Sequence, residues 1–185
     1  MKNHFPLVIK TLAAVSSALT LLFAVLYPLL PQAWLLCAAI SCGTTAYHFL
    51  MRLLVGALLP KLTDYRFDYR HPWFQPRSWE HSLYRLLKLK KWKGNLPTYS
   101  PEQFSLKHNS LHRVIQNMCG AELVHEVIMV LSFLPLTFAL PFGAFPVFLI
   151  TSVLAALYDS VFVMAQRFNR PRLVRIYEKQ EAHRP

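Results

Sequence analysis

The chain has 185 residues, of which 54% are hydrophobic, and its formal net charge is +11 at pH 7. Its basic residues lie almost entirely outside long apolar blocks, which is typical of loops that face anionic lipid and argues against a nucleic-acid-binding protein. The apolar blocks predict an all-α, polytopic membrane protein with about four transmembrane helices. At this length we expect one integral membrane domain over residues 1–185.

Two apolar blocks near the N-terminus predict the first two spans. Thr11–Leu30 carries no charged residue, and its length at 1.5 Å per residue crosses a hydrocarbon core of about 30 Å. No small-x-small cleavage site follows it, so we expect a retained helix rather than a signal peptide. After a turn containing Pro28 and Pro31, residues 33–59 predict a helix that returns across the membrane.

Residues 61–118 predict a basic belt on the cytoplasmic face of the membrane. They hold eleven Lys or Arg and four acidic residues. Within the belt, Ser78–Trp92 predicts an amphipathic helix that lies at the bilayer surface and ends near Gly94 and Pro97. A second helix is expected over Ser100–Asn117 and can run on into the next span. Both an interfacial and a re-entrant position of the belt stay open.

Residues 121–140 and 146–165 predict the third and fourth spans. The short turns within each pair of spans, residues 28–34 and 141–146, contain no Lys or Arg, whereas the N-terminus, the belt and the tail are basic. The positive-inside rule therefore predicts a multi-pass protein of the cell membrane with cytoplasmic N- and C-termini.

Three ionisable residues open the third span at positions i, i+3 and i+4, so Glu122, His125 and Glu126 leave one face of a helix. Ionisable groups near membrane depth usually face a protein interior or a watery cavity, and a His beside a carboxylate can act as a general base. The same triplet also suits a solvated helix start, where acids are favoured by the helix macrodipole. On spacing alone both interpretations stay open.

Charged residues also lie in or beside the other apolar blocks. Arg52 and Asp159 are expected to have a structural or secondary role, with an ion pair between them as one hypothesis. Ala165–Leu173 places arginines where the fourth helix emerges, and these suit either phosphate binding or ordinary positive-inside positions. In HEVIM, Met129 replaces the second His of a zinc-protease motif, so we predict no metal site, and we expect no cofactor.

Three motifs in order along the chain resemble the glycosyl-4,4'-diaponeurosporenoate acyltransferases, bacterial membrane enzymes of carotenoid biosynthesis. The motifs are WEHSLYRLLKLKKWKGNLP, CGAELVH and QRFNRPRL, and the resemblance covers about the C-terminal two thirds of the chain, from about Arg52 onward. The sequence departs from the expected pattern at Phe168, Asp159 and Glu126, where Tyr, Asn and a non-acidic residue are usual.

The resemblance implies transfer of a fatty acyl chain from a thioester donor to a sugar hydroxyl of a glycosylated carotenoid or terpenoid-type lipid. We expect His125 to act as general base and Glu122 to orient it, with Glu126 as a secondary residue. The expected substrate- and donor-binding residues are Trp79, Glu80, Lys91, Trp92, Lys93, Gln166, Arg167, Asn169, Arg170 and Arg172, with Lys90 beside them. The expected partners are membrane lipids, the glycosylated lipid acceptor and an acyl-CoA or acyl carrier protein, while the oligomeric state stays open.

Two functions from other classes also stay open. A non-catalytic membrane scaffold or lipid-binding protein would use the basic belt to recruit anionic lipid or a partner enzyme. A metal-dependent intramembrane hydrolase would use His and Glu side chains as ligands.

Overall fold

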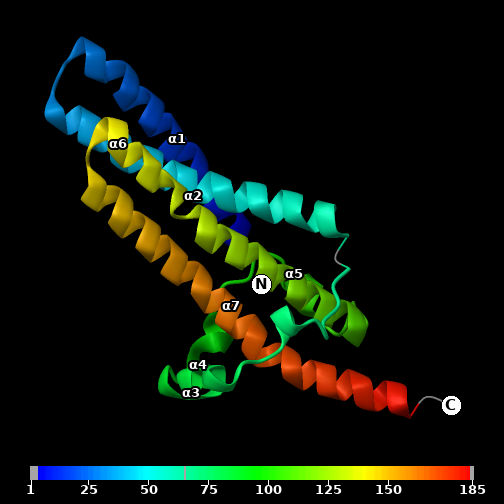
Figure 1. The fold of residues 1–185 in the computed structure, drawn as a ribbon. Coiled ribbons are helices and arrows are strands. Elements are labelled where there is room, and N and C mark those ends of the chain that lie inside the picture. The colour runs from blue at the N-terminus through cyan, green and yellow to red at the C-terminus, as the bar shows by residue number, and fades with distance from the viewer. Residues whose placement is uncertain (1–3, 65, 184–185) are drawn as a thin grey trace. The chain divides into compact units, whose positions relative to one another are not determined.

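A computed structural model describes residues 4–64 and 66–183 (Figure 1). The all-α prediction is confirmed, because this part of the chain is mainly helical and contains no strand. Four helical segments in it are long and apolar enough to cross a membrane: Phe5–Leu29, Ala33–Thr63, Leu111–Phe142 and Phe145–Ala182. The predicted number of transmembrane helices is therefore confirmed.

The two helices that contain the first two predicted spans are longer than those spans. Helix α1 covers Phe5–Leu29 and has a proline in its first turn, where the missing N–H group costs no helical hydrogen bond. Helix α2 covers Ala33–Thr63 and keeps Pro60 inside its last turn. The tight connection that was predicted between the two helices is present at residues 30–32.

The chain divides into two compact units, which are described separately below. The first unit contains Met1–Ala57 and Val127–Tyr158, and the second contains Leu58–Glu126 and Asp159–Pro185. Three long helices, α2, α5 and α7, contribute residues to both units. The single integral domain over the whole chain stays a prediction.

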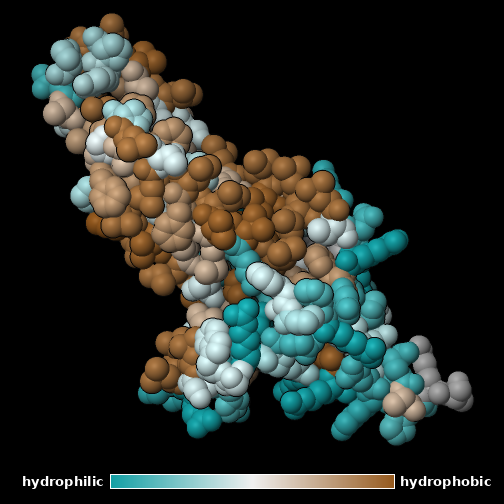
Figure 2. All heavy atoms as spheres, viewed as in Figure 1, coloured by the Kyte–Doolittle hydropathy of each residue, from teal (hydrophilic) through white to brown (hydrophobic). Residues whose placement is uncertain are grey.

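In the first unit, α1 and α2 approach each other closely at a small residue. A Cβ atom added to Gly43 would lie 3.3 Å from Cγ2 of Thr20, so glycine permits the contact. Large apolar side chains cover the visible outer surface of these helices (Figure 2), as expected for helices that face lipid. Arg52 donates hydrogen bonds to the carbonyl oxygens of His48 at 2.7 Å and Ala155 at 3.2 Å. Its predicted pairing with Asp159 stays a prediction.

In the second unit, the prediction of one continuous amphipathic helix over Ser78–Trp92 is wrong. The segment forms two helices, α3 (Ser78–Leu86) and α4 (Leu89–Trp92), separated by a turn at Lys88 with φ of 51°. This left-handed conformation is uncommon for a residue other than glycine. The turn allows Leu89 to be fully buried while Leu86 stays 78% exposed, so the apolar residues do not form one stripe.

The helix predicted for Ser100–Asn117 starts later than expected. Pro101–Phe104 is a 3-10 turn, and helix α5 covers Leu111–Leu131. The side chain of Asn109 donates hydrogen bonds to the carbonyl oxygens of Glu102 and Ser105, which stabilises the intervening turn. The expected continuation of this helix into the third span is confirmed. A 3-10 turn (Leu134–Phe138) and helix α6 (Ala139–Phe142) complete that span.

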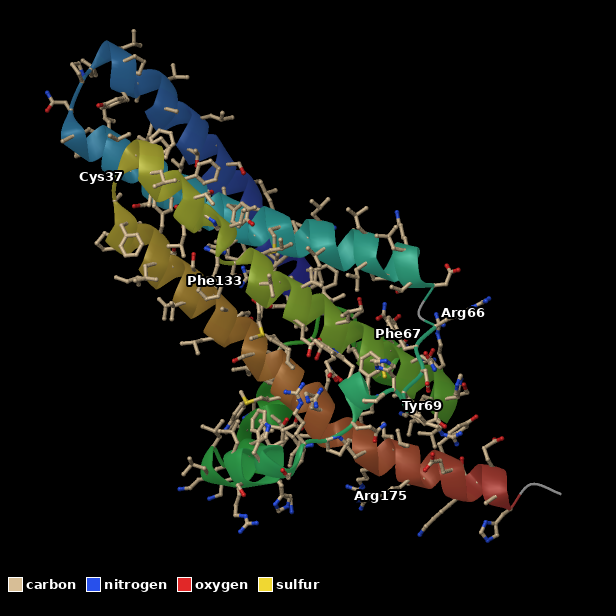
Figure 3. The ribbon with its side chains drawn as sticks, in the orientation of Figure 1. Cys37, Arg66, Phe67, Tyr69, Phe133 and Arg175 are labelled. Atoms are coloured by element: carbon tan, nitrogen blue, oxygen red, sulfur yellow. The ribbon has the colours of Figure 1, made fainter. Side chains whose placement is uncertain are left out.

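The segment around Phe67 is attached to α5 by the side chain of Gln116, which bonds both backbone groups of Phe67. The amide of Gln116 accepts a hydrogen bond from the N–H group of Phe67 at 2.5 Å and donates one to its carbonyl oxygen at 2.7 Å. Phe67 therefore lies against α5, with Arg66 and Tyr69 on either side of it along the chain (Figure 3).

The helix that contains the predicted fourth span continues past residue 165. Helix α7 covers Phe145–Ala182 and includes Pro171. It follows a turn in which Gly143 has φ of 67°, a conformation that glycine adopts readily. Near its C-terminal end, Tyr177 makes ring contacts with Tyr69 and His112. These contacts help to explain why the basic tail continues as a helix.

Candidate active site

The centre of the second unit is a buried cluster of two acids and two arginines, here called the ion cluster. Its members are Glu80 of α3, Glu122 of α5, and Arg167 and Arg170 of α7. All four side chains are buried, and Glu122 is completely so. The cluster is neutral when both acids are ionised, which offsets part of the cost of removing four charges from water.

The guanidinium of Arg167 donates four hydrogen bonds and makes one further ion-pair contact with protein groups. Its Nε and Nη2 atoms lie 2.8 and 2.6 Å from Oε1 of Glu80, and Nη1 donates to Glu122 at 2.6 Å. Nη1 also donates to the carbonyl oxygen of Trp73 at 2.9 Å, and Nη2 donates to that of Gln75 at 2.8 Å. A guanidinium has five donors in a planar fork, and at least four of them are engaged within the protein.

Arg170 completes the cluster from the next turn of α7. It donates to the second carboxylate oxygen of Glu122 and to the carbonyl oxygen of Phe74, and its guanidinium lies 5.1 Å from the centre of the Phe74 ring. Two arginines therefore bind three consecutive carbonyl groups, those of residues 73–75. The ion cluster fixes this short segment against α5 and α7.

His125 and Asp159 form a second polar contact between the same two helices. The Nδ1 atom of His125 lies 2.8 Å from Oδ1 of Asp159, whose side chain is only 1% exposed. The Phe162 ring stacks on the imidazole with centroids 4.6 Å apart and an angle of 9° between the planes. An ionised Asp159 holds the hydrogen on Nδ1 and leaves Nε2 as the basic nitrogen. The structure thus pairs His125 with Asp159 and binds Glu122 to the arginines.

Trp73 contacts the residue that follows His125 on α5, and the sequence did not predict it as a site residue. Its indole N–H group donates to Oε2 of Glu126 at 2.8 Å, and Glu126 directly follows His125 on α5. The sequence around it, HPWFQP, carries prolines on both sides but no motif that marks a site. Trp73 reaches α5 through long-range contacts, so local sequence patterns could not identify it.

A comparison with protein-family models identifies the family. The model of the glycosyl-4,4'-diaponeurosporenoate acyltransferases matches residues 70–179, which is more than half of the chain and includes the ion cluster, His125 and Asp159. The chain belongs to this family. It is therefore a membrane acyltransferase of a carotenoid-biosynthesis family, as the resemblance implied. Neither a search of curated proteins nor a search of solved structures gives a significant match.

In the acyltransferase, Lys93 lies at the junction of the α4 region and α7. Its ammonium group donates a hydrogen bond to Oδ1 of Asn169 and lies 4.9 Å from the centre of the Phe168 ring. Partial burial lowers the pKa of Lys93, and the positive charges of Arg172 and Lys90 lower it further. Arg172 and Lys90 each repel Lys93, so an anion bound beside these three cations, here called the Lys93 cluster, would be stabilised.

The other predicted binding residues are more dispersed. Trp79 and Lys91 are exposed, Gln166 is half-buried, and the indole N–H group of Trp92 donates to the carbonyl oxygen of Leu87 at 2.9 Å. In residues 4–64 and 66–183, no group of three or more His, Cys, Asp or Glu side chains is arranged to hold a metal ion. The site therefore combines a histidine–aspartate pair, a buried ion cluster and a group of cations around Lys93.

Proposed function

We propose that this acyltransferase moves a fatty acyl chain from a thioester donor to a sugar hydroxyl of a glycosylated carotenoid or terpenoid-type lipid. The observation that carries the proposal is the contact between His125 and the buried Asp159. Acylation of a hydroxyl requires removal of its proton, and a histidine oriented by a carboxylate is suited to that task. The description of the family model names a glycosyl-4,4'-diaponeurosporenoate as the acylated compound.

The chemical step is a direct transfer. Nε2 of His125 takes the proton of the sugar hydroxyl as its oxygen attacks the thioester carbonyl carbon. The tetrahedral intermediate collapses with cleavage of the C–S bond, and the departing thiolate receives the proton from the imidazolium. The products are a sugar ester and a free thiol. Asp159 keeps the imidazole in the required tautomer and stabilises its positive charge during the step.

Residues of α7 support the reaction at two places. Gln166 lies seven residues after Asp159 and therefore on the same helical face, from which its amide can donate to the oxyanion. The Lys93 cluster, with Lys91 nearby in sequence, binds the phosphate groups of acyl-CoA or the acidic surface of an acyl carrier protein. Arg167 and Arg170 act indirectly, because their N–H groups bind the carbonyl oxygens of residues 73–75 and fix this segment beside α5 and α7.

We place the acyltransferase in the cell membrane with both termini and the basic belt in the cytoplasm. The distribution of Lys and Arg supports this orientation, because the two short turns carry none. Acyl thioesters would then reach the Lys93 cluster from the cytoplasm, and the lipid acceptor would arrive laterally from the bilayer.

The test is mass spectrometry of lipids from cells that supply glycosyl-4,4'-diaponeurosporenoate. Cells with an empty vector are compared with cells that hold matched membrane amounts of wild type, His125→Ala or the control His108→Ala, which changes an exposed histidine of the belt. We expect a new fatty ester from wild type and the control, and none from His125→Ala. Wild-type ester yield from His125→Ala would overturn the general-base role. No ester from folded wild type would favour the scaffold function.

A further inference from the structure

Trp73 combines a fixed position with an exposed ring. Its backbone N–H group donates to Nδ1 of His71 at 3.2 Å, its carbonyl oxygen accepts from Arg167 at 2.9 Å, and its indole N–H group donates to Glu126 at 2.8 Å. Every hydrogen-bonding group of the residue is therefore engaged. The residue nevertheless stays 49% exposed.

The ion cluster makes this orientation rigid. The carbonyl groups of residues 73–75 are bound by Arg167 and Arg170, which are themselves buried and paired with Glu122. A side chain on such a segment loses little conformational entropy when a ligand packs against it. The cluster thus presents a preorganised aromatic ring whose indole N–H group is bound to Glu126 of α5.

The contact to Glu126 distinguishes Trp73 from an ordinary interfacial anchor. Tryptophans at membrane interfaces direct the indole N–H group toward the wet headgroup region. The N–H group of Trp73 instead forms a charge-assisted hydrogen bond with a carboxylate of its own unit. The protein, rather than the lipid, therefore determines how this ring is oriented.

We infer that the face of Trp73 binds the sugar ring of the acceptor lipid, an inference that rests on the proposed acyl transfer to a sugar hydroxyl. The C–H groups on one face of a pyranose pack against the negative face of an aromatic ring, while its hydroxyl groups point outward around the rim. The indole is bound to Glu126, which directly follows His125 on α5, so the proposed sugar site lies on the segment of α5 that contains the proposed general base. Trp73 then selects a glycosylated lipid over the same lipid without sugar.

The test compares the Michaelis constants of purified Trp73 variants in lipid nanodiscs. Trp73→Leu removes the aromatic face, Trp73→Phe retains a ring but loses the hydrogen bond to Glu126, and Trp34→Leu removes an exposed tryptophan of the first unit as a control for membrane anchoring. We expect Trp73→Leu to raise the KM for glycosyl-4,4'-diaponeurosporenoate about three- to tenfold, with an unchanged KM for the acyl donor. Trp73→Phe is expected to lie between wild type and Trp73→Leu, and Trp34→Leu to match wild type.

A binding experiment separates this inference from the proposed reaction. Tryptophan fluorescence of His125→Ala is followed as glycosyl-4,4'-diaponeurosporenoate, or the same acid without its sugar, is added to the nanodiscs. We expect a saturable change with the glycosylated lipid that is lost in the double variant with Trp73→Leu. Such binding without ester formation by wild type would contradict the proposed acyl transfer but support the sugar-binding role of Trp73. An unchanged acceptor KM in an active Trp73→Leu, or equal binding of both lipids, would overturn the sugar site alone.

Discussion

Nδ1 of His125 lies 2.8 Å from Oδ1 of Asp159, and the two residues come from α5 and α7. The aspartate is almost completely buried, whereas the His125 side chain is 24% exposed. Nδ1 of the imidazole is therefore held by a buried carboxylate, while part of the His125 side chain stays exposed. This division of roles is the geometry that a general base requires.

The first prediction concerns Asp159. Asp159→Leu keeps the approximate size of the side chain but removes the oxygen that holds the hydrogen on Nδ1 of His125, together with the charge that would stabilise the imidazolium. We expect the rate of ester formation per folded protein to fall about 100-fold or more, with little change in the KM for either substrate. The measurement is steady-state acyl transfer in nanodiscs, and a wild-type kcat in Asp159→Leu would remove this residue from the mechanism.

The sequence sufficed for features that depend on composition and local spacing. Long apolar blocks predicted the four spans, and the proline- and glycine-containing turns predicted where adjacent spans are connected. The i, i+3, i+4 spacing placed Glu122 and His125 on one side of a helix, but a shared face does not determine partners. Both residues bind side chains of α7, and such contacts depend on tertiary packing that no local pattern encodes.

Residues with long-range partners were therefore the ones least open to prediction. The arginines of QRFNRPRL were expected to bind a donor, yet Arg167 and Arg170 are buried among carboxylates and carbonyl groups. The turn at Lys88 also escaped prediction, since a lysine with positive φ is held by its context rather than by its intrinsic preference.

The second prediction tests whether the ion cluster is structural. Glu122→Gln removes the carboxylate that pairs with Arg170 and Arg167, and only Arg167 keeps a second acidic partner, Glu80. Leaving a buried charge without its partner lowers the free energy of unfolding by about 3–5 kcal/mol. We expect a clear fall in the thermal midpoint of the detergent-solubilised protein. Glu122→Leu combined with Arg170→Leu removes one charge of each sign and leaves Glu80 with Arg167, so it is expected to be more stable than Glu122→Gln. The reverse order would show that charge balance does not stabilise the cluster.

The third prediction concerns Tyr84, which donates a hydrogen bond to Glu80 at 3.1 Å. Burial raises the pKa of Tyr84 above its ordinary value of 10.0, and the negative charge of Glu80 raises it further. A tyrosine with a raised folded-state pKa contributes stability that is present below pH 10 and is lost as the pH rises through the folded-state pKa. Tyr84→Phe is expected to cost about 1 kcal/mol at neutral pH and to weaken the loss of stability at alkaline pH. Thermal melts of both proteins between pH 7 and 11 measure this difference, and parallel curves would contradict it.

The fourth prediction concerns the orientation in the membrane. In a background with the three native cysteines replaced by alanine, Gln32→Cys lies in the turn between α1 and α2, and His183→Cys lies just beyond α7. We expect a membrane-impermeant maleimide to label Gln32→Cys in intact cells and His183→Cys only after permeabilisation. The opposite pattern would invert the topology and place the Lys93 cluster away from cytoplasmic thioesters.

The last prediction uses the repulsion within the Lys93 cluster. Because burial and the nearby cations lower the pKa of Lys93 below its ordinary 10.5, the unfolded chain binds more protons than the folded protein as the pH approaches that value. Folding stability therefore rises with pH in this range, and the charged cluster is destabilising at neutral pH. Arg172→Gln removes one exposed cation while keeping the contact between Lys93 and Asn169.

Arg172→Gln should consequently raise the thermal midpoint at pH 7 and make the thermal midpoint rise less steeply with pH. The same change should raise the KM for the acyl donor about threefold or more at low salt. The control is Arg85→Gln, which removes an exposed cation of α3 outside the cluster and should leave the donor KM unchanged. A gain in stability together with a loss of donor affinity is expected only where like charges are kept together to bind an anion. A variant that is more stable and binds the donor as tightly as wild type would show that the Lys93 cluster has no part in donor binding.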